Sequence, residues 1–131
     1  MQIMLDLYSI YLVYLHMKKR GNIMNLNYND SLDKLLVGIN DKYKSWNSSL
    51  SYKPNGVDIS VKSGRKFDKI ISDKSVWGFV AKKDGEHKGL PFKEGDVFKP
   101  ASWSAAAKHV RGSIFDTNNN WYDWTGPNYL V

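Results

Sequence analysis

The sequence contains no cysteine and only three histidines, and these shortages exclude several kinds of site. A chain without cysteine has no disulfide framework, no thiolate zinc site and no cysteine nucleophile. His16, His87 and His109 do not have the spacing of metal ligands. There is also no nucleophile with an evident base and no glycine-rich phosphate loop before a helix. We therefore expect a protein that is not an enzyme and binds no metal or other cofactor.

Long apolar runs are scarce too, apart from one at the start of the chain. Residues 1–16 are apolar but lack a basic segment in front and a small-residue cleavage site, so they make a poor secretory signal. They also contain Asp6 and fall short of the roughly 20 residues that span a bilayer. One interpretation is a weak N-terminal apolar anchor, with the basic residues 18–20 on the cytoplasmic side.

We favour a different interpretation, in which residues 1–23 are a leader translated by mistake. Residues 18–23, Lys-Lys-Arg-Gly-Asn-Ile, are what an in-frame ribosome-binding site would encode just before Met24. Met24 would then be the true start, residues 24–131 would form a single domain, and no membrane would be involved. A chain of 131 residues builds one hydrophobic core and is too small for two.

Positive charge and aromatic side chains are abundant. The 19 Lys and Arg residues outnumber 13 Asp and Glu residues, for a net charge of +6, and the chain has five Trp and eight Tyr residues. The surplus lies between Lys53 and Arg111, where thirteen basic residues accompany seven acidic ones. This bias favours a polyanionic partner, although lysines on strand edges also protect a sheet from edge pairing.

Apolar periodicity predicts one helix followed by several strands. Asn29 or Asp30 can cap an amphipathic helix that ends at about residues 47–49 and should pack over a sheet. Its apolar stripe consists of Leu32, Leu35, Leu36, Ile39, Tyr43 and Trp46. Alternation predicts strands over residues 57–61, 66–72 and 75–82, with a bulge or a close backbone approach at Gly78, and residues 92–99 should form a turn followed by another strand. Because the links are short, these strands should be antiparallel.

A second, short helix is expected over Ser102–Arg111. Pro100 stops the preceding strand, Ser102 is a good N-cap and Gly112 suits the residue after the last turn. Its buried face would consist of Trp103, Ala106, Ala107 and Val110, at helical spacing. The chain should then resume extended structure over residues 113–116, form a loop over 117–120 and pack its aromatic end, from Trp121 onward, against the sheet. The expected fold class is therefore α+β: an N-terminal helix and a small antiparallel sheet, which can curl into a partial barrel and is interrupted by the short helix.

Several stretches of the chain together resemble a known family. The run KPASWSAAAKHVRGSIFD, followed by WTGPNYL and preceded by GRKFDKIIS and SVWGFV, is similar to a widespread family of small, uncharacterised tailed-phage proteins. The resemblance covers residues 64–130 and departs from the family at Ala105–Ala107, where a proline is common. It implies a phage or prophage origin and the cytoplasm of a bacterial host, and it transfers no catalytic residue.

Two functions fit these features. The first is a nucleic-acid-binding module for DNA or RNA, in which basic side chains neutralise phosphates and Trp77 or Trp103 offers a ring on which a base stacks. The candidate basic residues are Lys82, Lys83, Lys99, Lys108 and Arg111. The second is a phage accessory protein that binds a host protein or a small anionic ligand and has no affinity for nucleic acid.

Overall fold

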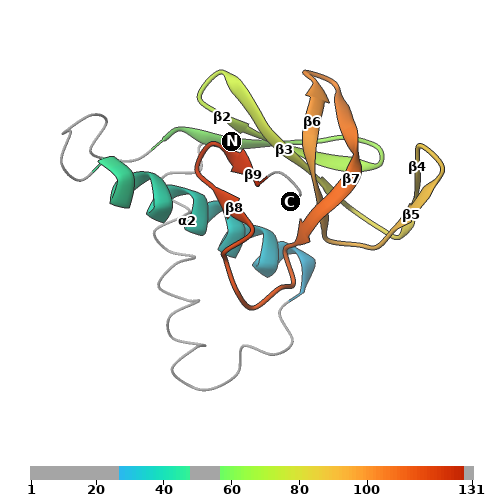
Figure 1. The fold of residues 1–131 in the computed structure, drawn as a ribbon, viewed down its shortest axis with the longest axis horizontal. Helices are drawn as coiled ribbons and strands as arrows, with labels where there is room; N and C mark the ends of the chain where they lie inside the picture. The colour runs from blue at the N-terminus through green and yellow to red at the C-terminus, as the bar shows by residue number, and fades with distance from the viewer. Residues whose placement is uncertain (1–26, 48–56, 129–131) are drawn as a thin grey trace.

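The part of the chain that the structure describes folds into one helix and a five-stranded antiparallel sheet with two small hairpins, as shown in Figure 1. This computed structural model describes residues 27–47 and 57–128. The helix is α2 (Tyr28–Asn47), and the sheet has the order β1-β2-β3-β6-β7. The sheet strands are β1 (Ile59–Ser63), β2 (Phe67–Ser72), β3 (Ser75–Ala81), β6 (Asp96–Ser102) and β7 (Ala105–Ser113). The expected α+β class is confirmed, and the sheet does not close into a barrel.

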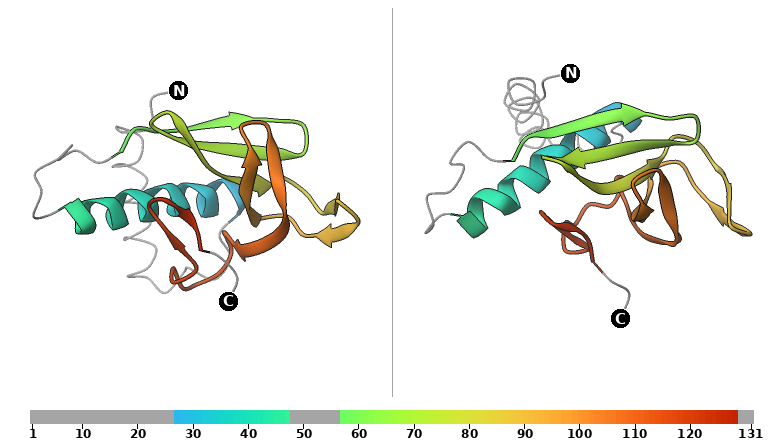
Figure 2. Two further views of the ribbon diagram at one scale, coloured as in Figure 1. Left: turned by 45° about the horizontal axis from the view of Figure 1, so that its top comes forward. Right: turned by 90° about the horizontal axis from the view of Figure 1, so that it is seen from above.

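The two hairpins lie at different ends of the molecule. The first pairs β4 (Gly85–His87) with β5 (Leu90–Phe92), and the second pairs β8 (Tyr122–Asp123) with β9 (Gly126–Pro127). Figure 2 shows the β4–β5 hairpin projecting away from the sheet, whereas the β8–β9 hairpin lies beside α2. The apolar residues 1–16 lie outside the described residues, and no helix within the described part is long and apolar enough to cross a membrane.

The helix starts slightly earlier than its sequence suggests. Asn27, rather than Asn29 or Asp30, caps it: the Asn27 Oδ1 atom accepts a hydrogen bond of 2.9 Å from the backbone N–H of Asp30. The predicted apolar stripe is buried as far as Tyr43, whereas Trp46 keeps 51% of its surface exposed. The stripe therefore places α2 against the sheet, as its periodicity predicts.

The predicted helix over Ser102–Arg111 is wrong, because these residues form the hairpin between β6 and β7. Trp103 and Ser104 make its two-residue turn, and Ser102 pairs with Ala105. Pro100 is accommodated because it faces Ala106 where the register shifts on both sides, so its missing N–H breaks no regular ladder. Burial of Ala106 against a cluster of phenylalanines outweighs the helical preference of the alanine run.

The two faces of the sheet carry separate apolar clusters. The larger cluster lies between the sheet and α2 and includes Ile59, Ile70 and Val80, from β1, β2 and β3 respectively. The smaller cluster lies on the opposite face. Its buried members are Phe79, Ala81, Phe92, Phe98 and Ala106. Alternation along β2 explains the division, since residues at even positions face α2 and residues at odd positions face away.

A bulge in β3 decides where Trp77 lies. Ile70 pairs with Gly78 but Ile71 pairs with Val76, so Trp77 is the extra residue. A side chain at position 78 would place its Cβ 2.9 Å from the carbonyl oxygen of Phe98, which confirms the expected bulge and close approach. Because the bulge reverses the alternation, Trp77 joins the helix-side cluster and is only 1% exposed.

The aromatic end of the chain packs as expected. Tyr122 is 5% exposed and its ring meets that of Trp77 edge to face, with centroids 5.8 Å apart. The ring of Trp124 lies 5.1 Å from Tyr43 and 4.8 Å from Trp46 on the last turns of α2. These contacts fasten the β8–β9 hairpin to the helix.

Candidate functional site

Two adjoining hollows open on the face of the sheet that points away from α2, around the β1–β2 turn. They have volumes of about 280 Å³ and 520 Å³ and share Arg65 and Lys66 as lining residues. Between them they are lined by six basic side chains and one carboxylate, that of Asp84. We call the six the basic face: Lys62, Arg65, Lys66, Lys69, Lys82 and Lys83.

Strand register brings two of these lysines directly opposite each other. Lys62 on β1 pairs with Lys69 on β2, and the row continues through Phe79 on β3 to Phe98 on β6. Side chains in directly opposite positions lie on the same face, and like charges there destabilise a sheet. Lys62 and Lys69 therefore extend over the same side of the sheet, where the Lys69 amine turns toward Trp103.

The hydrogen bonds of the basic face leave its charge uncompensated. Lys66 donates to the carbonyl oxygen of Glu86, and Lys82 donates to the hydroxyl of Ser63 at 2.7 Å and to the carbonyl oxygen of Gly64 at 3.1 Å. All of these acceptors are uncharged. Asp84, the one carboxylate of the lining, accepts a hydrogen bond of 2.8 Å from the backbone N–H of Glu94, and its single negative charge offsets only one of the six cations. The surface consequently presents a concentrated positive potential.

Trp103 stands beside this charge at the tip of the β6–β7 hairpin. Its side chain is 55% exposed. The Nζ atom of Lys69 lies 4.5 Å from the centre of its ring and donates a hydrogen bond of 2.8 Å to its carbonyl oxygen. Lys69 thus holds both the backbone and the ring of Trp103 at the edge of the basic face. The arrangement combines cations with an accessible aromatic surface.

The structure brings together only some of the residues that the sequence suggested. Lys82 and Lys83 line the larger hollow, and Trp103 adjoins Lys69. Trp77, in contrast, is buried in the helix-side core and has no free ring face to offer to a base. Lys108 is exposed on β7 but lines neither hollow.

Lys99 and Arg111 lie apart from the basic face and bind the end of the chain. Lys99 donates to the carbonyl oxygen of Pro127, and the Nη1 atom of Arg111 donates to that of Asn128 at 3.3 Å. Burial, and after it the neighbouring Arg111 guanidinium, lowers the pKa of Lys99. Both side chains secure β9 against the sheet.

The sequence did not single out four members of the basic face: Lys62, Arg65, Lys66 and Lys69. The proximity of two of them could nevertheless have been predicted from the strand pattern. Lys62 and Lys69 occupy outward positions of two alternating strands joined by the short turn at residues 63–66, and such a turn sets the register that makes them opposite. Within the described ranges 27–47 and 57–128, no group of three or more acidic or histidine residues could hold a metal ion.

Comparison with known proteins assigns this chain to a family without identifying an activity. The chain belongs to DUF7717, a family of unknown function, whose model matches residues 11–130. That match begins upstream of Met24, and the leader interpretation of residues 1–23 stays a prediction. No curated protein matches the chain significantly, and no solved structure does.

Proposed function

We propose that this protein is a small, non-catalytic module that binds single-stranded nucleic acid through the basic face and Trp103. The observation that supports this most strongly is the gathering of six cations around two adjoining hollows with one carboxylate among them. Lysine and arginine side chains on such a surface neutralise phosphates and release their counterions, which provides affinity without sequence preference. The resemblance of its motif to tailed-phage proteins supports a role in the cytoplasm of an infected bacterium.

The exposed ring of Trp103 favours single-stranded nucleic acid over a duplex as the ligand. An exposed indole beside cations can stack on an unpaired base while the neighbouring amines contact its phosphates. In a duplex the bases already stack on one another, so only the phosphate contacts remain available. Single-stranded DNA or RNA therefore uses both parts of the surface.

A small anionic ligand is the competing function, and the hollows favour it specifically. A hollow of about 280 Å³ lined by Lys62, Arg65, Lys66 and Lys69 would suit a compact anion. The two functions differ in how affinity depends on ligand length. A strand that crosses both hollows binds more tightly as it lengthens, whereas a compact anion binds as well alone as within a polymer.

Fluorescence anisotropy of the full-length chain tests the proposal. The probes are labelled single-stranded DNA, RNA and duplex DNA of increasing length, together with inorganic phosphate and a mononucleotide as competitors, at several salt concentrations. We expect single strands to bind best, with log affinity falling by about 0.7 per log unit of salt for each phosphate contacted. Equal affinity for a mononucleotide and a long strand would favour the small anion instead.

Substitutions that remove positive charges test which surface contacts the nucleic acid. Lys62→Gln with Lys69→Gln should weaken single-strand binding by tenfold or more and reduce the salt slope by about 1.4, because two phosphate contacts are lost and Lys69 no longer holds Trp103 in place. The control is Lys44→Gln with Lys74→Gln, which removes the same charge from exposed positions that do not line the hollows. Equal losses in the two variants would show that only net charge matters and would refute the assignment of this face.

Trp103→Ala tests the stacking contribution separately. Loss of one base stack should weaken single-strand binding by about 5-fold to 150-fold, from roughly 1–3 kcal/mol per stacked base. Duplex binding should stay unchanged, because it does not use the ring. Unchanged single-strand affinity would remove Trp103 from the interface.

A further inference from the structure

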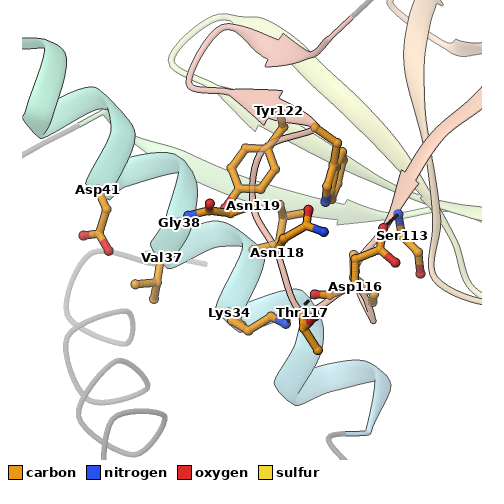
Figure 3. A pocket seen from close by; sticks show the side chains of 13 residues that line it. Lys34, Val37, Gly38, Asp41, Ser113, Asp116, Thr117, Asn118, Asn119 and Tyr122 are labelled. Carbon is orange, nitrogen blue, oxygen red and sulfur yellow. Dashed lines mark hydrogen bonds between the residues drawn. The ribbon is translucent and has the colours of Figure 1, made fainter. Parts of the chain in front are cut away.

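A cavity of a different character lies on the opposite side of the molecule, between α2 and the segment that connects β7 to β8. It has a volume of about 360 Å³ and shares no lining residue with the basic face. Figure 3 shows that α2 forms one wall and the loop over residues 116–119 forms the other. The nucleic-acid proposal leaves this cavity without a role.

Two lysines of α2 hold the loop wall in place. Lys34 donates a hydrogen bond of 3.1 Å to the carbonyl oxygen of Asp116. Lys42 donates to the carbonyl oxygen of Asn119, and to that of Tyr122 at 2.6 Å. Because both amines are bound to backbone carbonyls, they fix the course of the loop without engaging the side chains of Thr117, Asn118 and Asn119. A wall fixed in advance lowers the entropic cost of binding.

Because Gly38 has no side chain, the wall that contains Tyr122 can approach α2 closely. The hydroxyl of Tyr122 fills the space above this glycine, and a Cβ there would lie 2.0 Å from that oxygen. The tyrosine ring is itself held by Lys42, whose Nζ atom lies 4.4 Å from the ring centre. The contact between helix and loop is therefore tight at the base of the cavity.

The lining offers many hydrogen-bonding groups beside an apolar wall. Ser113, Thr117, Asn118 and Asn119 contribute hydroxyls and amides, which both donate and accept. Leu35, Val37, Ile114 and Trp121 contribute apolar surface. This mixture matches a ligand that carries hydroxyl groups on a carbon framework.

Charge within the cavity disfavours an anion. Two carboxylates, those of Asp41 and Asp116, accompany one amine, that of Lys34. Burial lowers the pKa of Lys34, against the opposing influence of the Asp116 carboxylate, and burial raises the pKa of Asp41, against that of the Lys44 amine. Both shifts follow from the partial burial of the two side chains at the cavity, and its one amine is outnumbered by two carboxylates.

We infer that this cavity is a second binding site, which takes a small uncharged polyhydroxylated molecule of monosaccharide size. The carboxylates and amide oxygens accept hydrogen bonds from ligand hydroxyls, while the Lys34 amine and the amide N–H groups of Asn118 and Asn119 donate to ligand oxygens. The apolar wall, including Trp121, covers the C–H face of the ring. The site is independent of the basic face, and either could exist without the other.

Ligand-detected saturation-transfer NMR of the full-length chain tests this inference. The probes are glucose, galactose, mannose, N-acetylglucosamine and ribose, with inorganic phosphate and spermidine as charged competitors. We expect at least one sugar to bind with a dissociation constant on the order of 1 mM. Binding of only phosphate or spermidine, or of no probe, would overturn the inference.

A matched pair of loop variants ties the signal to the cavity. Asn118→Ala should weaken sugar binding by about tenfold, because one side chain that both donates and accepts is lost. Asn120→Ala should leave it unchanged, because Asn120 belongs to the same loop but does not line the cavity. Lys62→Gln with Lys69→Gln should also leave it unchanged. Equal effects of the two asparagine variants would indicate loop distortion and would overturn the assignment.

Discussion

The two faces of the five-stranded sheet are built from the same strands but differ in how completely they are covered. On the helix side, Ile59, Ile70 and Val80 are each 0% exposed beneath α2. On the other face, a smaller phenylalanine cluster covers only part of the sheet, and the remainder carries opposed lysines. The covered face supplies most of the apolar burial, whereas the open face carries charge that folding does not need. Substitutions on the two faces should therefore have different consequences.

The largest effect is expected at Trp77, in the covered core. Trp77→Ala removes a side chain that is 1% exposed and a hydrogen bond of 3.0 Å from its indole N–H to the carbonyl oxygen of Asp123. The free energy of unfolding should fall by about 3–5 kcal/mol, measured by urea denaturation. Trp103→Ala, at an exposed position, should change it by less than about 0.5 kcal/mol. Similar losses at both positions would contradict the distinction between the faces.

A smaller effect is expected at Tyr28, whose hydroxyl donates a hydrogen bond of 2.7 Å to the Oδ2 atom of Asp68. Asp68 is 6% exposed, so Tyr28→Phe would leave a carboxylate oxygen buried without this donor. The free energy of unfolding should fall by about 1–3 kcal/mol at neutral pH. No loss in a urea titration would show that solvent replaces the phenol.

The hydrogen bond between Tyr28 and Asp68 also predicts that the stability of the protein falls at alkaline pH. Burial first, and then the hydrogen bond and the negative charge of Asp68, raise the pKa of Tyr28 well above its usual 10.0. Since the unfolded chain releases this proton first, the stabilisation is complete below the usual pKa and is lost as pH rises above it. The stability difference between the wild-type protein and Tyr28→Phe should thus shrink steadily above about pH 10. A constant difference across that range would contradict this assignment.

A loss of stability of similar size to that of Tyr28→Phe is expected where α2 meets Tyr122. Gly38→Ala should destabilise the protein by about 1–3 kcal/mol, because the new methyl group would collide with the tyrosine hydroxyl. In a Tyr122→Phe background the nearest remaining ring atom lies 3.2 Å away, and the better helix propensity of alanine should make the same change nearly neutral. Thermal denaturation of the four proteins gives the coupling energy. Strict additivity would refute the proposed collision.

The smallest effect on stability is expected on the open face. Lys62→Gln removes one of two directly opposed charges and leaves a polar side chain that is one atom shorter. Stability should rise by about 0.2–1 kcal/mol at low salt, and the gain should shrink as salt screens the repulsion. Lys74→Gln, in the exposed β2–β3 turn, is the control. A clear loss of stability in Lys62→Gln alone would show that this lysine supports the fold.

Most elements could be predicted because their patterns are local. The stripe from Leu32 to Tyr43 and the alternation over residues 57–61 each settle which side of the element is buried. The helix prediction over residues 102–111 was wrong because the alanines of this segment fit the spacing of a helix as well as that of a strand. Its conformation depends on a partner strand, β6, and on phenylalanines from distant positions, which no local window contains.

The candidate interface was predictable only in part for a similar reason. Lys82, Lys83 and Trp103 were recognisable as basic or aromatic residues, but Lys62 and Lys69 become neighbours only through strand pairing. Trp77 was also recognisable as aromatic, but the bulge in β3 moves its side chain from the open face to the covered face. Composition does not indicate which face a side chain joins when a bulge intervenes.

The sequence by itself determined the fold class, the positive surplus and the absence of thiol chemistry, because these follow from composition and short-range periodicity. Tertiary structure decided which cations meet, which tryptophan is exposed and where a polar cavity opens. The reason is that strand register and the packing of α2 against the loop join residues far apart along the chain. Those long-range contacts place the basic face and the cavity on different sides of the molecule.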